Sequence, residues 1–454
     1  MTSTLENVAV CILGERVDNQ APLVILTRAA LTEVTIRVMG PRGEAVESVR
    51  VGDVAAYSVT RRVLNLGRAE SYVVHAAGYD HGLGPYAFPS PEKVRKVGVV
   101  CCDAHWHLPV RQTWHDLERE TEVGTVFHIG DQIYHDLRFS RMMNFLRSVR
   151  GREADYMAHA HRLFVDNYIE SWSMAHKRGV LGDRHNVMLG DDHEITDDMV
   201  TALPNAGRSE FESLKAVAIS VYRLIQGGLR ANPLTAQNDF HTAVVGSTLY
   251  LMMGRMYNMV QSVDDCVTFV DSVINDPEVM GSVRTVALLM SKPPLNKSAL
   301  LPYMSHSRFA QLDFSPLYQR LFRLRDRMGK RVILVGGDLH VLYRWEIRPT
   351  AAEPDASLPP PITLTSIPAM ASCVITPPMP VNAGLPDGCG FTGTQVSRAR
   401  VNGFAVIDTD SGEVRCVTRR FMTHYLRNEC YVGLKALWAM FTVQRLNPNL
   451  ELLT

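Results

Sequence analysis

The stretch Thr125-Val-Phe-His-Ile-Gly-Asp-Gln-Ile-Tyr134 carries the main clue to the architecture of this chain. Its first half is a run of strand-forming residues, and its second half places a glycine, a carboxylate and a tyrosine directly behind that run. In an open α/β sheet, ligands bind outside the carboxyl ends of the strands. The stretch therefore predicts a sheet edge that binds metal or phosphate.

The same arrangement occurs at four other places in the sequence. In each, a short apolar run ends in residues that can bind metal or phosphate: Val97–Val100 before Cys101-Cys-Asp-Ala-His105, Asn186–Leu189 before Gly190-Asp-Asp-His-Glu194, Thr285–Met290 before Ser291-Lys-Pro-Pro294, and Arg331–Val335 before Gly336-Gly-Asp-Leu-His340. Asp-x-His and Gly-Asp are common when taken singly. Their order and their placement behind strands together indicate one shared polynuclear metal site.

The N-terminal part of the chain has a different pattern from the rest. Residues 6–92 contain closely spaced short alternating runs with turn signals between them, which is typical of a small β-sandwich. The segment Gly78–Pro91 is rich in Gly and Pro, so we expect it to be a linker. From about residue 95, strands alternate with helical patterns, which indicates a layered α/β domain.

Several later elements can be placed from the pattern alone. Helices are expected at 137–178, 208–230, 262–275, 307–328 and, at the end, near Gly433–Val443. Val401–Asp408 and Glu413–Arg420 predict a hairpin because Thr409-Asp-Ser-Gly412 joins them as a turn. Residues 351–394 are rich in Pro and Gly and predict an irregular surface segment, with a rim or lid over the site as the alternative.

The composition excludes several classes of protein. Lys plus Arg and Asp plus Glu number 47 each, so there is no electrostatic footprint for nucleic acid or for an anionic membrane surface. No stretch approaches about 18 consecutive apolar residues, and the N-terminus lacks a signal-peptide or twin-arginine pattern. The eight cysteines are scattered without a Cys-x-x-Cys pair, which is compatible with a reducing compartment. These features predict a cytoplasmic protein that does not bind membranes; they leave the oligomeric state open.

The quoted motifs resemble those of the calcineurin-like metallophosphoesterase superfamily. More narrowly, Gly130-Asp-Gln-Ile-Tyr-His-Asp136, Asp191-Asp-His-Glu-Ile195 and Gly337-Asp-Leu-His340 resemble the alkaline phosphatase D branch, the PhoD-like phosphatases. The resemblance covers roughly residues 6–420 and implies an α/β fold, a four-layer αββα sandwich. It also implies an N-terminal β-sandwich domain at residues 1–92, before a catalytic domain at 93–454.

The resemblance implies roles for individual residues around a first metal ion. Asp131 would bridge two ions, and His340 would bind the first of them. Asp103 and His105, two residues apart behind a strand, can both face that ion. In this branch Ser-Cys often stands where this chain has Cys101-Cys102, so Cys102 is an alternative ligand to Asp103. Tyr134 lies three residues after Asp131, as in purple acid phosphatases, where a tyrosinate binds ferric iron.

A second ion is expected to have mainly oxygen ligands. Asp192 stands where the superfamily has Asn, and Asp338 where it has the first His of Gly-His-x-His. Ser291 replaces the expected fourth-motif histidine, for which His241 or His306 could substitute. Oxygen ligands suit calcium, magnesium or manganese rather than zinc. We therefore expect two or more metal ions, with iron plus one of these hard divalent ions preferred and zinc possible.

The function implied is hydrolysis of phosphate mono- or diesters by a two-metal-activated water, with a small-molecule phosphate ester as substrate. His193 matches the catalytic histidine, which contacts phosphate and can protonate the leaving group. Lys292 could offset phosphate charge, but a solvated surface lysine is the expected reading. The alternative function is a non-catalytic protein that binds a ligand or partner on a decayed phosphoesterase fold.

Overall fold

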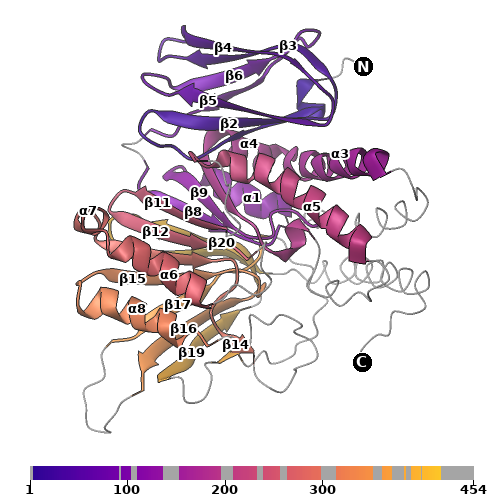
Figure 1. Ribbon diagram of the computed structural model, residues 1–454. Helices are drawn as coiled ribbons and strands as arrows, with labels where there is room; N and C mark the ends of the chain where they lie inside the picture. Colours follow the sequence, from indigo (N-terminus) through magenta and orange to yellow (C-terminus); the bar gives the residue numbers. More distant parts are fainter. Residues whose placement is uncertain are drawn as a thin grey trace.

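The computed structural model describes residues 4–90, 94–103, 110–135, 153–195, 208–232, 239–255, 263–297, 313–350, 360–370, 383–384, 390–399 and 401–420. The chain folds into a mixed α/β structure with several sheets (Figure 1). None of the described helices has the length and apolar character needed to cross a bilayer.

Residues 9–87 form two antiparallel sheets, drawn at the top of Figure 1. Among the described residues, one sheet has the order β1-β2-β5 and the other β4-β3-β6-β7. Their strands are β1 (Ala9–Leu13), β2 (Gln20–Thr27), β3 (Leu31–Met39), β4 (Ala45–Val54), β5 (Ser58–Asn65), β6 (Ser71–His75) and β7 (Leu83–Ala87). In β3, Val34, Ile36 and Val38 are buried, and they join Cys11 and Ile25 of the other sheet in one apolar cluster. The two sheets therefore share a core.

Two larger sheets form the rest of the described structure. Within the described residues the first has the order β10-β9-β8-β20-β21, and the second β11-β12-β13-β15-β17-β16-β19. The first contains β8 (Lys96–Val100), β9 (Val123–Ile129), β10 (His185–Leu189), β20 (Val401–Asp408) and β21 (Val414–Arg420). The second contains β11 (Phe240–Val245), β12 (Thr248–Met253), β13 (Thr285–Met290), β15 (Arg331–Gly336), β16 (Leu342–Pro349), β17 (Ile362–Ser366) and β19 (Phe391–Ala399). A short pair, β14 (Asn296–Lys297) and β18 (Ala383–Gly384), lies outside both.

The two larger sheets face each other across an apolar layer. Val99 and Phe127 from the first sheet and Tyr250, Leu289 and Val335 from the second belong to one buried cluster. The strands at its centre have near-continuous apolar burial, as expected for strands covered on both faces. β8, β9 and β10 are parallel to one another, and so are β12, β13, β15 and β17. Parallel strands place the residues that follow them along a common edge of each sheet.

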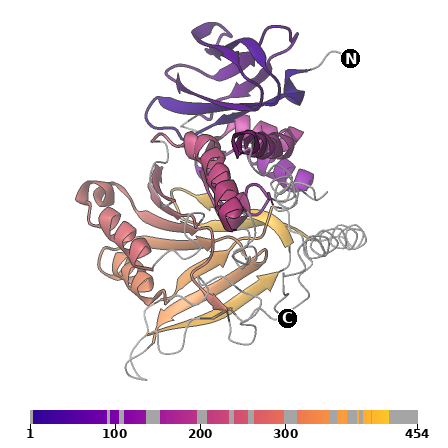
Figure 2. The same cartoon turned by 45° about the vertical axis from the view of Figure 1, so that its right-hand side comes forward.

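Helices cover the outer faces of both sheets, as the two views show (Figures 1 and 2). α6 (Val263–Ile274), α7 (Pro277–Ser282) and α8 (Ser315–Asp326) pack on the second sheet. α1 (Val110–Arg119) and α4 (Ala175–Asp183) pack on the first. α3 (Glu153–Trp172) and α5 (Arg208–Ile225) share one buried cluster with Val10, Ile12 and Val24 of β1 and β2, and this cluster joins the N-terminal sheets to the rest. Short 3-10 turns are η1 (Leu5–Asn7), η2 (Asp192–Glu194) and η4 (Gly227–Leu229).

The structure corrects some predicted elements and confirms others. The hairpin is confirmed as β20 and β21. The prediction of an irregular segment at 351–394 is wrong in part, because Ile362–Ser366 forms the interior strand β17; the prolines around it masked its apolar Ile362 and Leu364. The expected linker likewise contains β7, which pairs with β6. The helix expected at 137–178 ends and restarts at Ser173-Met174, and the one near Gly433–Val443 lies outside the described residues.

Candidate metal centre

The segments that follow β8, β9, β10, β13 and β15 meet at one place. Gly130 allows this close approach: a Cβ at this position would lie 2.7 Å from the Cβ of Asp191 and 3.0 Å from the Cβ of Ser291. Its φ of +100° also lies in a region that favours glycine. The strand-end clusters predicted from sequence are thus brought together by the topology of the two sheets.

Cys102, Asp131 and His340 form the first group of possible metal ligands. Their ligand atoms all lie within 4.8 Å of one another, and the Cys102 Sγ is 3.4 Å from Asp131 Oδ2. The Tyr134 hydroxyl lies 3.2 Å from His340 Nε2, so it borders the same group. Sulfur, nitrogen, carboxylate and phenol donors in one place suit a transition metal.

The backbone at these ligands is held in an uncommon conformation. Cys102, Asp131, Asp338 and His340 have φ values of 54°, 57°, 58° and 53°. Residues other than glycine adopt this left-handed region at a cost, and such strain clusters at functional sites. The surrounding structure therefore imposes these positions on the ligands.

Asp103 points away from this group. Its carboxylate forms a fully buried ion pair with the ammonium of Lys177, which lies 5.2 Å from the ring centre of Trp114 and 5.6 Å from that of Trp172. Sequence alone favoured Asp103 over Cys102; the structure brings Cys102, not Asp103, to Asp131 and His340. Cys102 thus belongs to the candidate metal group, whereas its neighbour Asp103 belongs to a core ion pair. His105 lies outside the described residues.

Four carboxylates make up a second group beside the first. Ligand oxygens of Asp131, Asp191, Asp192 and Asp338 all lie within 4.8 Å of one another. Asp192 and Asp338 were expected here from sequence, whereas Asp191 was not assigned a role. Asp191 also accepts a hydrogen bond from the backbone N–H of Asp192, at 2.7 Å, as the cap of η2.

Two basic side chains enter this second group: Arg255, which sequence reasoning missed, and Lys292, which it expected at the surface. Arg255 forms ion pairs with Asp191, with Asp192 at 2.7 Å and with Asp338 at 3.5 Å. Lys292 pairs with Asp338 at 3.0 Å and is only 5% exposed, so the expectation of a solvated surface lysine is wrong. In the sequence, Arg255 lies within the mainly apolar stretch Leu251–Met259. Its charge in that stretch is the one signal that could have indicated a site.

Glu194 holds the segments of the site together. It is fully buried and accepts hydrogen bonds from the backbone N–H groups of Asp131 at 3.1 Å, Gln132 at 2.7 Å and Asp191 at 2.7 Å. Asp191 and Glu194 form a capping box, and the Asp-x-x-Glu spacing in the sequence could have indicated this role. Glu194 therefore fixes the strand-end segments behind β9 and β10 relative to each other.

His193 lies at the side of the group. Its ring stacks on Tyr134 with a 4.1 Å separation of ring centres, and it can share an ion site with Asp131 and Asp192. His193 is only partly buried. The structure thus brings His193 to the predicted site. There its imidazole could either bind a metal ion or act as a general acid.

Several donors of the site have raised pKa values, an effect that a bound cation would offset. Burial raises the pKa of Asp131, Cys102 and Tyr134 well above their usual ranges, and neighbouring anionic groups add to this effect. Burial opposes ionisation of Asp192 too, but the Arg255 guanidinium lowers its pKa below the usual value. A bound cation would reverse the penalty on the first three groups, because it favours their ionised forms. The Cys102 group therefore fits a metal ion.

Other histidines near the motifs have structural partners. His128 contacts Gln132 Oε1 and Asn186 Oδ1, both at 2.9 Å, and His135 contacts Asn167 at 2.8 Å. His241 pairs with Glu15 at 2.9 Å, so its imidazole is used outside the group. His306, the other substitute for the missing histidine, lies outside the described residues.

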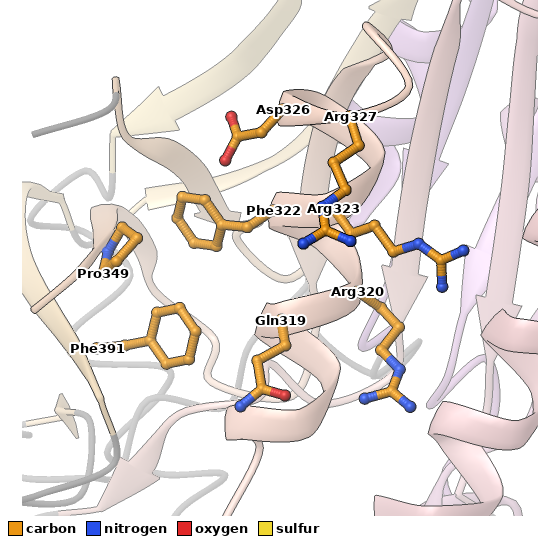
Figure 3. A pocket seen from close by; sticks show the side chains of 8 residues that line it. All are labelled: Gln319, Arg320, Phe322, Arg323, Asp326, Arg327, Pro349 and Phe391. Atoms are coloured by element: carbon orange, nitrogen blue, oxygen red, sulfur yellow. The ribbon is translucent and has the colours of Figure 1, made fainter.

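Two further features lie away from the strand ends. His115 and Glu118 of α1 and His176 of α4 form a partly exposed group that could hold an ion. A hollow of about 390 Å³ beside α8 is lined by Gln319, Arg320, Phe322, Arg323, Asp326, Arg327, Pro349 and Phe391 (Figure 3). Figure 3 shows arginine and phenylalanine side chains there, and Arg320 is paired with Asp271 at 3.0 Å. This hollow lacks the donor set of the strand-end groups.

Comparison with known proteins supports the fold. No family model matches the chain, and no curated protein matches its sequence. The solved structure of PhoD aligns with a TM-score of 0.55 and 11% identity over 92% of this chain and 93% of that chain. A purple acid phosphatase isolated from yellow lupin (Lupinus luteus) seeds aligns with a TM-score of 0.51 and 11% identity over 90% of this chain and 74% of that chain. At such identities the likeness shows a shared, metallophosphoesterase-like fold.

Proposed function

We propose that this chain is a metal-dependent hydrolase of phosphate mono- or diesters, of the PhoD-like branch. The observation that carries the proposal is the group of Cys102, Asp131, Tyr134 and His340 at the strand ends. This group has the donors of a transition-metal site and lies in a fold shared with PhoD and a purple acid phosphatase. A small-molecule phosphate ester is the proposed substrate.

Each residue of the first group has a proposed task. Cys102, Asp131 and His340 hold the ion, and Tyr134 adds a phenolate, which makes iron the preferred metal. A bound ion supplies Lewis acidity towards a phosphoryl oxygen and lowers the pKa of a water. The sequence also predicts a second, hard divalent ion on Asp131, Asp192 and Asp338, and hence a two-metal-activated water; that number of ions stays a prediction.

His193 is proposed as the general acid. Asp192 precedes it; the Asp192 carboxylate faces the acidic group, while the imidazole of the partly buried His193 stacks on Tyr134. An imidazole in this place can donate a proton to the departing oxygen of an ester. Tyr134 fixes the ring plane by stacking, which orients the donor.

The wider organisation is proposed on the same resemblance. We assign residues 1–92 to a β-sandwich domain and 93–454 to a four-layer catalytic domain. The shared core of the two N-terminal sheets and the helices outside the two facing sheets support this assignment. A cytoplasmic location remains a prediction from sequence.

The test compares Asp131→Asn with Asp271→Asn. Asp271 of α6 is paired with Arg320 of α8, away from the site, so it controls for removal of an aspartate charge. We expect Asp131→Asn to lose bound metal and to cut hydrolysis of nitrophenyl mono- and diesters by at least about 10²-fold, whereas Asp271→Asn keeps both. A wild-type protein that binds metal but hydrolyses neither ester would favour the non-catalytic alternative. Full activity in Asp131→Asn would refute the site.

A further inference from the structure

The acidic group already contains positive charge from the protein itself. Arg255 pairs with three of its carboxylates, those of Asp191, Asp192 and Asp338, and Lys292 pairs with Asp338 from another side. The region expected to hold a second divalent ion is thus occupied by two protein cations. Their combined charge equals that of such an ion.

Arg255 is fixed in this position by the backbone. It follows β12, its N–H donates to Gly190 O at 3.2 Å, and it is only 2% exposed. The preceding Gly254 passes so close to the segment behind β10 that a Cβ there would lie 2.4 Å from Asp239 Oδ2 and 2.7 Å from Gly190 O. Only glycine fits at position 254 in this close approach. The backbone of Arg255 is thus held beside the segment behind β10, with its side chain buried among the carboxylates.

The first group differs in this respect. Among the described residues, Asp131 has no ion pair with Lys or Arg, although its carboxylate is fully buried. Cys102 and His340 supply soft and nitrogen donors there, whereas the second group consists of four carboxylates, with the His193 imidazole beside Asp131 and Asp192. The position expected to provide an imidazole to the second ion holds the buried Ser291. Among the described residues, the Lys and Arg counter-charges thus pair with Asp191, Asp192 and Asp338 and not with Asp131.

We propose that Arg255, supported by Lys292, takes the place of the second metal ion, so that the chain binds a single catalytic ion. This inference rests on the proposed function and specifies its metal requirement. A guanidinium is a permanent cation with a fixed planar set of donors, so it can hold Asp191, Asp192 and Asp338 in place as a metal would. A divalent ion entering the same group would be repelled by it at short range.

Two consequences distinguish an arginine from a metal. The positive charge opposite Asp192 and Asp338 persists when chelators remove metal, so these segments keep their positions in the metal-free protein. The arginine cannot lower the pKa of a water as a second ion would, so activation saturates at one ion per chain. Arg255 is therefore a positioning residue in this account, acting through the carboxylates that it orients.

The experiment counts metal ions in wild type and in two variants. Protein purified without a metal-chelating column is stripped, dialysed against excess Mn²⁺ and analysed for bound metal. We expect one ion per chain in wild type and two in Arg255→Met/Lys292→Met, which frees the acidic group. Arg320→Met is the matched control, because it removes an arginine paired with Asp271 elsewhere, and it should keep one ion.

Each other outcome is decisive. Two ions in wild type, with both retained in His176→Asn, which removes a ligand of the His115–Glu118–His176 group, would overturn the inference and leave the proposed function intact. One ion in the folded double variant would also overturn it, because the carboxylates would then hold no metal even without competition. No bound metal together with no ester hydrolysis would reject the proposed function itself. If the double variant does not fold, electron paramagnetic resonance of Mn²⁺-loaded wild type decides: an isolated-ion spectrum supports the inference, and a coupled-pair spectrum refutes it.

Discussion

Replacing Lys177 by methionine should destabilise the protein by about 3–5 kcal/mol and leave its metal content unchanged. The side chains of Lys177 and Asp103 are 1% and 0% exposed, so the partner left behind has no water to solvate it. Lys177 also donates to Ser171 Oγ at 3.1 Å and lies over two tryptophan rings. Methionine has no charge and no N–H donor, so it cannot make these contacts. Methionine keeps the apolar stem, so the loss is mainly that of the charge.

The assay is chemical unfolding of four proteins: wild type, Lys177→Met, Asp103→Asn and the double variant. We expect each single variant to be strongly destabilised and the double variant to lose less than the sum, because it leaves no buried charge unpaired. Lys96→Met is the control: the Lys96–Glu122 pair is on the surface, where such a pair contributes roughly 0–1 kcal/mol.

Metal content separates the two roles that sequence left open for this segment. Asp103→Asn should keep its metal, whereas Cys102→Ala should lose it, because only the Cys102 thiol faces Asp131 and His340. If Asp103→Asn loses metal while its unfolding free energy stays at the wild-type value, Asp103 is a ligand and the reasoning from the ion pair fails.

Three other predictions concern single side chains. Protein containing iron should show a visible absorption band that Tyr134→Phe abolishes; an unchanged band would exclude the tyrosinate. His193→Ala should keep its metal and slow alkyl phosphate esters by about 10²–10⁴-fold, far more than nitrophenyl esters, whereas equal losses on both would exclude a general acid. Burial lowers the pKa of His185 to about 4, below the usual 6.5, and its Nδ1 lies 3.0 Å from Gly14 O. The unfolded chain therefore binds the proton first, so stability should fall as pH drops from about 6.5 to 4, by roughly 3 kcal/mol from this residue. His185→Asn, followed by urea unfolding across that range, should flatten the dependence; an unchanged slope would show that His185 does not titrate in this way.

The strand-end motifs could be predicted because they depend on local order. A buried strand followed by Gly-Asp places the aspartate at the sheet edge whatever the rest of the chain does. Asp131, Asp192, Asp338 and His340 accordingly lie together in the structure. The hairpin of β20 and β21 was equally local, since turn residues separate two alternating runs.

The choice between Cys102 and Asp103 could not be made in this way. It depends on the positive φ of Cys102, and on Lys177, which is 74 residues distant from Asp103 in sequence. Arg255 was missed for a related reason: it belongs to no motif, and its role arises only when β12 is placed beside β13. Contacts between distant segments create both features, and a single sequence does not display them.

The interior strand β17 was missed because local composition pointed the other way. Pro359-Pro-Pro361 indicates an irregular segment, and only five residues after it form the strand. Pairing with β15 and β16 and burial of Ile362 and Leu364 outweigh the neighbouring prolines. Tertiary packing decided the structure of this segment.

Anomalous X-ray scattering from crystals of the metal-loaded protein tests the central claim most directly. The account predicts a metal peak bonded to Cys102 Sγ, Asp131, Tyr134 Oη and His340 Nε2, with Arg255 still paired to Asp192 beside it. The account would be contradicted by a fully loaded crystal with no peak at these four side chains, or with a peak bonded to Asp103 in place of Cys102.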